Sequence, residues 1–336
     1  MRARFTRTSA LLSVVAATAF VFACGSDAIS EADPDQNDPD GAVRIDPDTG
    51  EPITDDGGTP IEDGAGPQAQ EAVMIGAGDI SSCSGTGGNA SEATAKILDK
   101  LSGTIFTAGD NAYATGTDKE FTCYDARWGR QKARTLPAPG NHDYLQKNAA
   151  PYFKYFGAAA GDPTKGYYSK DVGPWHVIVI NSNCAEIGGC AATSPQAKWL
   201  EADLAAHTQK CTMAIWHHPL YNMGNHGPAT EMKPIWQILY DHDADLVVNG
   251  HDHNYQRWKP QTPAGKVDEA RGIVELLVGT GGAAFYDFDP KPANIEVNDN
   301  VTFGVIKLTL RPTDMDFEFV PVEGQTFTDK GTITCH

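Results

Sequence analysis

Five short segments of this 336-residue chain carry side chains that can bind metal ions. They are, in order, Gly78-Asp79-Ile80, Gly109-Asp110-Asn111-Ala112-Tyr113, Gly140-Asn141-His142-Asp143, His217-His218-Pro219 and Gly250-His251-Asp252-His253. Together they offer oxygen and nitrogen donors and no thiolate, a set that suits hard or borderline cations. Two such cations about 3.5–4 Å apart neutralise the charge of a phosphate ester and lower the pKa of a water molecule from about 15.7 towards 7. The donor set therefore indicates metal-assisted hydrolysis of a phosphate ester.

Each segment is a weak signal by itself, because each has a common structural explanation. An aspartate after a strand is usually a turn former, and Asn141 alone would most often be a turn residue. The His217-His218 pair alone is more often structural than functional. His251 and His253 are a stronger signal, because alternate residues of a strand lie on the same face. The ordered occurrence of all five segments in one chain is what favours a shared site.

Four of the five segments follow a short apolar run, and the Asn141 segment follows Leu136-Pro137-Ala138-Pro139 instead. Buried strands are predicted at Ala72–Ala77, Thr104–Ala108, His176–Ile180, Thr212–Trp216 and Leu246–Asn249. Helices are predicted between them at Ser91–Leu101, Ser194–Ala206, with Ser194 as N-cap, and Thr230–Asp241. After Tyr255 only strands are predicted, at Ile273–Val278, Phe303–Leu310 and Met315–Val320. This alternation predicts an α/β fold, in which the C-terminal ends of the strands bring the five segments to one edge.

The set of segments and its order resemble the calcineurin-like metallophosphoesterase superfamily, and within it the purple acid phosphatases. The resemblance extends from about Val73 to Thr332. Most of the superfamily has Asp-x-His in the first motif, whereas Ser81 stands at the histidine position here. Tyr113, three residues after Asp110, matches the purple acid phosphatase arrangement instead. The resemblance implies a single catalytic domain with a four-layer α/β/β/α sandwich, two packed sheets flanked by helices.

The resemblance also implies two metal sites that share one carboxylate. The first would be formed by Asp79, Asp110, Tyr113 and His253, and the second by Asp110, Asn141, His217 and His251. A phenolate ligand implies Fe(III) in the first site, and the second would hold divalent Fe, Zn or Mn. The implied role of His142 is to protonate the leaving-group oxygen, and that of His226 is to face the substrate.

The predicted function is hydrolysis of phosphomonoesters by a metal-bound hydroxide, of the acid phosphatase type, on a small-molecule phosphate ester. The nearest alternative is a phosphodiesterase that acts on nucleotides with the same two metals. An alternative of another class is a non-catalytic lipoprotein that binds a ligand. The chain has neither a Walker motif nor a Gly-x-Ser-x-Gly elbow. Its formal net charge of -18 argues against nucleic-acid binding, and no protein partner is evident.

The first 24 residues are predicted to be a lipoprotein signal peptide. Arg2, Arg4 and Arg7 precede an apolar stretch, Ala10–Ala23, that is too short to span a bilayer. Val21-Phe22-Ala23-Cys24 resembles a bacterial lipobox, in which Cys24 would carry the lipid. The resulting prediction is an exported, membrane-anchored lipoprotein at the outer membrane or cell surface. If Cys24 is not lipidated, an ordinary signal peptide and a secreted protein are expected.

Residues 25–71 are predicted to be a disordered acidic linker, followed by the catalytic domain over residues 72–336. The linker contains 14 acidic residues and a single basic one, Arg44, and few large apolar residues. Such a composition cannot bury enough surface to offset the entropy of ordering.

The cysteines also favour export. If Cys24 is lipidated, six of the seven cysteines remain, an even number that suits disulfides in an oxidising compartment. Six cysteines allow 15 pairings, of which we favour Cys83–Cys123, Cys184–Cys190 and Cys211–Cys335. A zinc cluster is the competing use of these residues, but the chain has no Cys-x-x-Cys pair.

Overall fold

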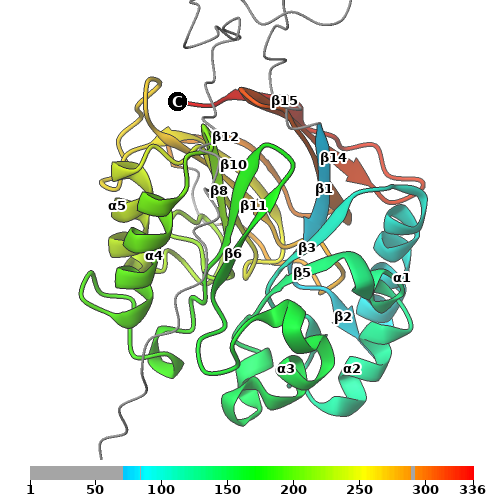
Figure 1. Cartoon of the computed structure of the whole chain (residues 1–336). Coiled ribbons are helices and arrows are strands. Elements are labelled where there is room, and N and C mark those ends of the chain that lie inside the picture. Colours follow the sequence, from blue (N-terminus) through cyan, green and yellow to red (C-terminus); the bar gives the residue numbers. More distant parts are fainter. Residues whose placement is uncertain (1–70, 84, 289–291) are drawn as a thin grey trace, which may run out of the picture. The chain divides into compact units, whose positions relative to one another are not determined.

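Two large β-sheets lie at the centre of the fold in the computed structural model, which describes residues 71–83, 85–288 and 292–336 (Figure 1). The six-stranded sheet consists, in spatial order, of β15 (Lys330–Thr334), β14 (Asp314–Pro321), β13 (Gly304–Leu310), β1 (Ala72–Ala77), β3 (Thr104–Ala108) and β5 (Thr135–Ala138). The seven-stranded sheet consists of β12 (Ile295–Asp299), β10 (Tyr255–Gln261), β11 (Ile273–Val278), β9 (Leu246–Asn249), β8 (Cys211–Ile215), β7 (Trp175–Val179) and β6 (Tyr168–Val172). A short parallel pair is formed by β2 (Ser81–Ser82) and β4 (Ala112–Tyr113).

Helices cover the outer faces of the two sheets. The α-helices are α1 (Gly85–Lys100), α2 (Asp118–Asp125), α3 (Ala150–Phe156), α4 (Pro195–Ala206) and α5 (Lys233–Asp241). The described residues also contain 3₁₀ segments, namely η1 (Trp128–Arg134), η2 (Asp143–Leu145), η3 (Lys147–Ala149), η4 (Gly157–Ala160), η5 (Cys184–Glu186) and η6 (Thr230–Met232). Figure 1 shows α4 and α5 on one side of the sheets and α1, α2 and α3 on the other.

Two apolar layers hold this arrangement together. One lies between the sheets, where Phe106 of β3 and Met213 of β8 belong to the same buried cluster. The other packs Val247 of β9 against Leu200 of α4 and Trp236 of α5. Because the seven-stranded sheet is buried on both faces, its central strands are continuously apolar, as parallel strands of α/β proteins are. The predicted four-layer α/β/β/α fold is confirmed.

The predicted elements agree closely with those of the structure. Strands β1, β3, β9 and β11 have the predicted bounds, whereas β7 and β8 each begin one residue earlier than predicted. The hydroxyl of Ser194 accepts a hydrogen bond from the backbone N–H of Ala197 at 3.2 Å and so caps α4 as expected. The first predicted helix begins earlier, at Gly85, and the third divides into η6 and α5.

Strand β5 was missed by the sequence analysis, and its position explains why. It contains Pro137, which cannot donate a hydrogen bond and therefore lowers the predicted strand propensity. In the structure β5 lies at the edge of the six-stranded sheet and pairs in parallel with β3 only. An edge strand tolerates proline, so the Asn141 segment follows a strand like the other four.

The three disulfides have the pairing favoured from the sequence, Cys83–Cys123, Cys184–Cys190 and Cys211–Cys335. Among the described residues, no helix combines the length and apolar character needed to cross a bilayer. The predicted signal peptide, Cys24 and residues 25–70 of the predicted linker lie outside the described residues.

Candidate metal centre

Parallel strands of both sheets end at the same place, and the five segments follow these ends. Asp79 follows β1, Asp110 follows β3 and Asn141 follows β5, all in the six-stranded sheet. His217 and His251 follow β8 and β9 of the seven-stranded sheet, which also run in parallel. The site is therefore assembled from both sheets at their common C-terminal edge.

The turns after these strands are tight and linked to one another. Asp79, Asp110 and His251 have positive φ angles of 60°, 51° and 75°, a left-handed conformation that is uncommon for non-glycine residues and concentrates at functional sites. The backbone N–H of Asp79 donates to the carbonyl of Gly109 at 3.1 Å, and that of Gly250 donates to the carbonyl of His217 at 3.2 Å. These bonds fix the turns, and with them the side chains of the site.

The four residues predicted for the first metal meet around the hydroxyl of Tyr113. This oxygen lies 2.7 Å from Asp79 Oδ1, 2.9 Å from Asp110 Oδ2 and 3.1 Å from His253 Nε2. The Nδ1–H of His253 donates to the carbonyl of Ala284 at 2.6 Å, so Nε2 presents a lone pair to the cluster. A single hydroxyl proton cannot satisfy three acceptors, and a cation fits this set of donors.

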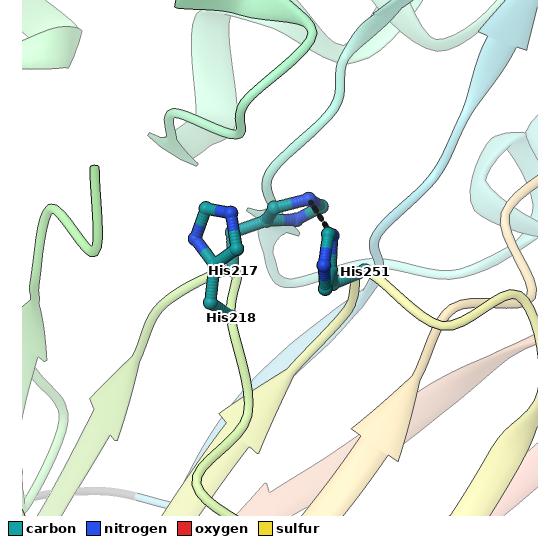
Figure 2. A group of neighbouring side chains, drawn as sticks. All are labelled: His217, His218 and His251. Carbon is teal, nitrogen blue, oxygen red and sulfur yellow. Dashed lines mark hydrogen bonds between the residues drawn. The ribbon is translucent and has the colours of Figure 1, made fainter. Parts of the chain in front are cut away.

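The four residues predicted for the second metal meet around Nε2 of His217. This nitrogen lies 3.0 Å from Asn141 Oδ1, 3.2 Å from His251 Nδ1 and 3.3 Å from Asp110 Oδ2. Because the Nδ1–H of His217 donates to the carbonyl of Ala108 at 2.8 Å, Nε2 is the nitrogen that faces the other three atoms. A positive charge at this place, either a proton on Nε2 or a metal ion that displaces it, fits the three neighbouring lone pairs. Figure 2 shows His217 and His251 in contact, with His218 beside them.

Asp110 joins the two clusters. Its Oδ2 atom lies within 3.3 Å of both Tyr113 Oη and His217 Nε2, and its side chain is only 2% exposed. The residue therefore has the position expected of a carboxylate that bridges two metal ions.

The pKa values of His217 and Tyr113 show that Asp79 and Asp110 make the surroundings of these two side chains strongly negative. Burial lowers the pKa of His217, but the charges of Asp110 and Asp79 outweigh it and raise this pKa to about 9. Burial is the main cause that raises the pKa of the Tyr113 phenol well above its usual value, and the negative charges of Asp110 and Asp79 raise it further. Burial and the neighbouring His217 lower the pKa of His251. Two buried carboxylates create this field, and a cation among them would offset it.

His142, the predicted acid, lies at the open side of the first cluster. Its ring packs against that of Tyr113 with 4.5 Å between centroids, and its side chain is 30% exposed. Its Nδ1–H donates to the carbonyl of Ala114 at 2.6 Å, which leaves Nε2 free at 3.8 Å from Asp110 Oδ2. This nitrogen can reach both the cluster and a bound molecule.

His226, the predicted substrate-facing residue, packs on the second cluster, with 4.2 Å between its ring centroid and that of His251. Its Nδ1 atom contacts Asp252 Oδ1 at 3.0 Å, so its Nε2 is free. Asp252 is fully buried and also accepts a hydrogen bond from the Nδ2 of Asn222. The loop that carries His226 is thus held by a carboxylate placed between two of the predicted ligands.

The roles of Asp252 and Asp143 were not predicted from the sequence. The buried Asp143 accepts hydrogen bonds from the backbone N–H of Gly140 at 2.9 Å and from the Nδ2 of Asn111 at 3.0 Å, which holds the turn at Asn141. Each of these aspartates adjoins a predicted functional histidine, which is the signal that could have identified them.

The structure corrects the reason given for His251 and His253. They lie in the loop after β9, not on one face of a strand, and they enter different clusters. His218 is a neighbour of the second cluster, with its Nδ1 atom 2.8 Å from Ser182 Oγ. Burial, with His217 beside it, lowers the pKa of His218 to about 3.

Residues 75–255 match the model of the calcineurin-like phosphoesterase family. This match covers more than half of the chain, and the chain therefore belongs to that family. Purple acid phosphatase 21 of Arabidopsis thaliana is 27% identical in an alignment over 199 residues that covers 56% of this chain and 38% of that protein. Tartrate-resistant acid phosphatase type 5 of Mus musculus is 23% identical over 201 residues, 50% of this chain and 60% of that protein.

Solved structures share the fold. A purple acid phosphatase isolated from yellow lupin (Lupinus luteus) seeds has a TM-score of 0.66 at 19% identity, over 80% of this chain and 54% of that one. A Plasmodium protein described as the anchor in the inner membrane complex has a TM-score of 0.59 at 13% identity, over 79% of this chain and 89% of that one. The chain spans less than two thirds of the length of the curated relatives above.

Replacement of Gly140 by alanine is expected to impair metal binding without unfolding the protein. A Cβ atom at this position would lie 2.1 Å from Asp110 Oδ1 and 2.3 Å from the backbone nitrogen of Asp110, so the Asp110 turn must shift. Metal content per chain, measured by mass spectrometry of the purified variant, should fall while the circular dichroism spectrum is retained. Full metal content in Gly140→Ala would contradict the role given to this turn.

Proposed function

We propose that this chain hydrolyses phosphomonoesters at a centre of two metal ions. The observation that carries the proposal is the position of Asp110 Oδ2, which adjoins both groups of lone pairs. One buried carboxylate oxygen between two such groups suits a pair of cations better than a single ion. Hydrolysis of phosphate esters is the activity that the family and the purple acid phosphatase relatives support.

The donor chemistry of the two groups differs, and this supports two kinds of ion. Asp79, Asp110, Tyr113 and His253 would hold the first ion, and Asp110, Asn141, His217 and His251 would hold the second. A phenolate favours Fe(III), whereas the amide and imidazole groups suit divalent Fe, Zn or Mn. When bound, the two ions would neutralise the phosphate oxygens and lower the pKa of a water molecule.

The protein's own residues would orient the ester and move its protons. His142 Nε2, free and partly exposed, would donate a proton to the leaving-group oxygen, a contribution of about 10²–10⁴-fold for a well-placed acid. His226, oriented by Asp252, would hold a phosphate oxygen through Nε2. Burial of Asp79 and Asp110 keeps water from weakening their interaction with the cations.

The first test compares kcat/KM for an aryl phosphate monoester with that for the matching diester. A monoester has one more ionised oxygen than a diester, and two cations beside His142 and His226 favour that extra charge. We expect the monoester to be preferred. A higher kcat/KM for the diester would support the phosphodiesterase alternative, and absence of hydrolysis of either ester by metal-loaded protein would support a binding protein. The Plasmodium anchor has a similar fold, so the fold alone does not decide between these functions.

The Tyr113→Phe variant tests the assignment of Fe(III). The oxidised protein should show a visible phenolate-to-iron charge-transfer band, and this variant should lose it because only the phenol oxygen is removed. Tyr286→Phe is the matched control and should keep the band. The Tyr286 ring stacks on that of His253, with 4.1 Å between centroids, but Tyr286 belongs to neither ligand group. A colourless, active wild type without iron would exclude the purple acid phosphatase subtype.

The His142→Ala variant tests the leaving-group role. Loss of the acid should reduce kcat by about 10²–10⁴-fold for a poor leaving group such as an alkyl alcohol, and much less for nitrophenol, which leaves without protonation. His242→Ala, at a histidine paired with Glu201 on the surface, should change neither rate. Equal losses with both substrates would contradict the role of His142 as an acid.

We also propose that the chain is exported and lipidated at Cys24. Three disulfides support an oxidising compartment, because such bonds rarely persist in the cytosol of mesophiles. When cells are grown with a radioactive fatty acid, the wild-type protein should become labelled and the Cys24→Ala variant should not. Equal labelling of the two proteins would contradict lipidation at Cys24.

A further inference from the structure

A second group of histidines and carboxylates lies away from the candidate centre, at the edge of the seven-stranded sheet. Asp171 belongs to the edge strand β6, His176 to β7, and Asp203 and His207 to the C-terminal end of α4. His176 pairs with Thr212 of β8, five residues before His217. At about 3.3 Å per residue, this corresponds to roughly 16 Å along the sheet. The group is therefore separate from the candidate metal centre.

His176 is buried between two carboxylates. Its Nδ1 atom lies 2.9 Å from Asp171 Oδ1, and its Nε2 atom lies 2.8 Å from Asp203 Oδ2. Asp203 is fixed in turn, because its Oδ1 atom accepts a hydrogen bond from Ser169 Oγ at 2.6 Å. If Nε2 carries the proton, Nδ1 offers its lone pair beside a carboxylate oxygen. A carboxylate behind an imidazole is the arrangement that orients histidine ligands in metal sites.

His207 offers a second imidazole, in which one nitrogen is again held by Asp203 and the other is free. Its Nδ1–H donates to the backbone carbonyl of Asp203 at 2.6 Å, which leaves Nε2 free. One potential ligand atom from each of Asp171, His176 and His207 lies within 4.8 Å of the other two. The rings of His176 and His207 are stacked, with 3.7 Å between centroids. A tilt of His207, whose side chain is 32% exposed, would bring the three atoms around one ion.

The charges around this group favour a cation. Among the described residues, neither Asp171 nor Asp203 forms an ion pair with a lysine or arginine. Gln209 donates to Asp171 Oδ2 at 2.7 Å, while its own Oε1 atom is buried without a hydrogen-bond partner. Two carboxylates thus face two imidazoles, and a divalent ion would balance them.

We propose that Asp171, His176 and His207 form a further binding site for a divalent transition metal such as Zn²⁺. Two imidazoles and one carboxylate are a common protein ligand set for zinc, with water completing the tetrahedron. Binding would displace any proton on His176 Nδ1 to solvent. The ion would join β6 to the end of α4, and so stabilise the edge of the sheet without taking part in hydrolysis.

The experiment measures zinc per chain by equilibrium dialysis, with the full protein at micromolar free zinc. Wild type is expected to bind one more zinc ion per chain than His207→Ala or Asp171→Asn, because each variant removes one ligand. Asp203→Asn should bind this ion about 10–100-fold more weakly, since it changes only the residue behind His176. The zinc-dependent rise in melting temperature should be smaller in all three variants.

His242→Ala is the matched control, because His242 is also a partly exposed histidine paired with a carboxylate, Glu201, at 3.1 Å. It should bind as much zinc as wild type. Hydrolysis by His207→Ala should equal that of wild type, since the two sites are separate. Equal zinc content in wild type and in His207→Ala and Asp171→Asn would overturn the proposal, and so would an equal loss in His242→Ala.

Discussion

The arrangement of the site depends on burying the carboxylates of Asp79 and Asp110 side by side. An isolated buried carboxylate is costly, so each must be compensated by hydrogen bonds or by positive charge. One oxygen of each is used to hold another segment: Asp79 Oδ2 accepts the backbone N–H of His251, and Asp110 Oδ1 accepts that of His142, both at 2.8 Å. The other oxygen of each faces Tyr113. The same two side chains therefore assemble the segments and supply donors for cations.

Close approach of the backbone explains why glycines precede these residues. A Cβ atom at Gly109 would lie 2.4 Å from Nδ1 of His217, so any other residue there would displace that ring. Gly109 also has a φ of +87°, which glycine adopts without strain. Because His217 comes from the other sheet, this contact sets how closely β3 and β8 approach at the site. The glycines are part of the geometry of the donors and not merely turn residues.

The sequence predicted the ends of the strands before Asp79, Asp110 and His251 well, because the information for them is local. The apolar runs before these residues located the strand ends, since a buried parallel strand must be apolar on both faces. The strand before Asn141 was missed, because only the three-dimensional position of β5 at a sheet edge makes Pro137 acceptable there.

Contacts between distant segments could not be read from the chain in the same way. The hydrogen bond from Asn111 to the buried Asp143, which holds the turn at Asn141, joins residues 32 positions apart, and neighbouring sequence does not indicate it. The partnership of Asp252 with His226 likewise joins residues 26 positions apart. The residue types and the family resemblance predicted which residues would form each ligand group, whereas the carboxylates that hold these residues in place were recognised only in the fold.

The cap at the start of α2 also affects the candidate metal centre. Thr117 and Glu120 form a capping box at the start of α2, in which each side chain accepts the backbone N–H of the other. The Glu120 carboxylate also accepts hydrogen bonds from the backbone N–H groups of Ala114 and Thr115. The carbonyl of Ala114 in turn receives the Nδ1–H of His142. Glu120 therefore holds the loop after Tyr113, and this loop determines which nitrogen of His142 is free. In this way a helix cap selects the tautomer of the residue proposed to donate the proton.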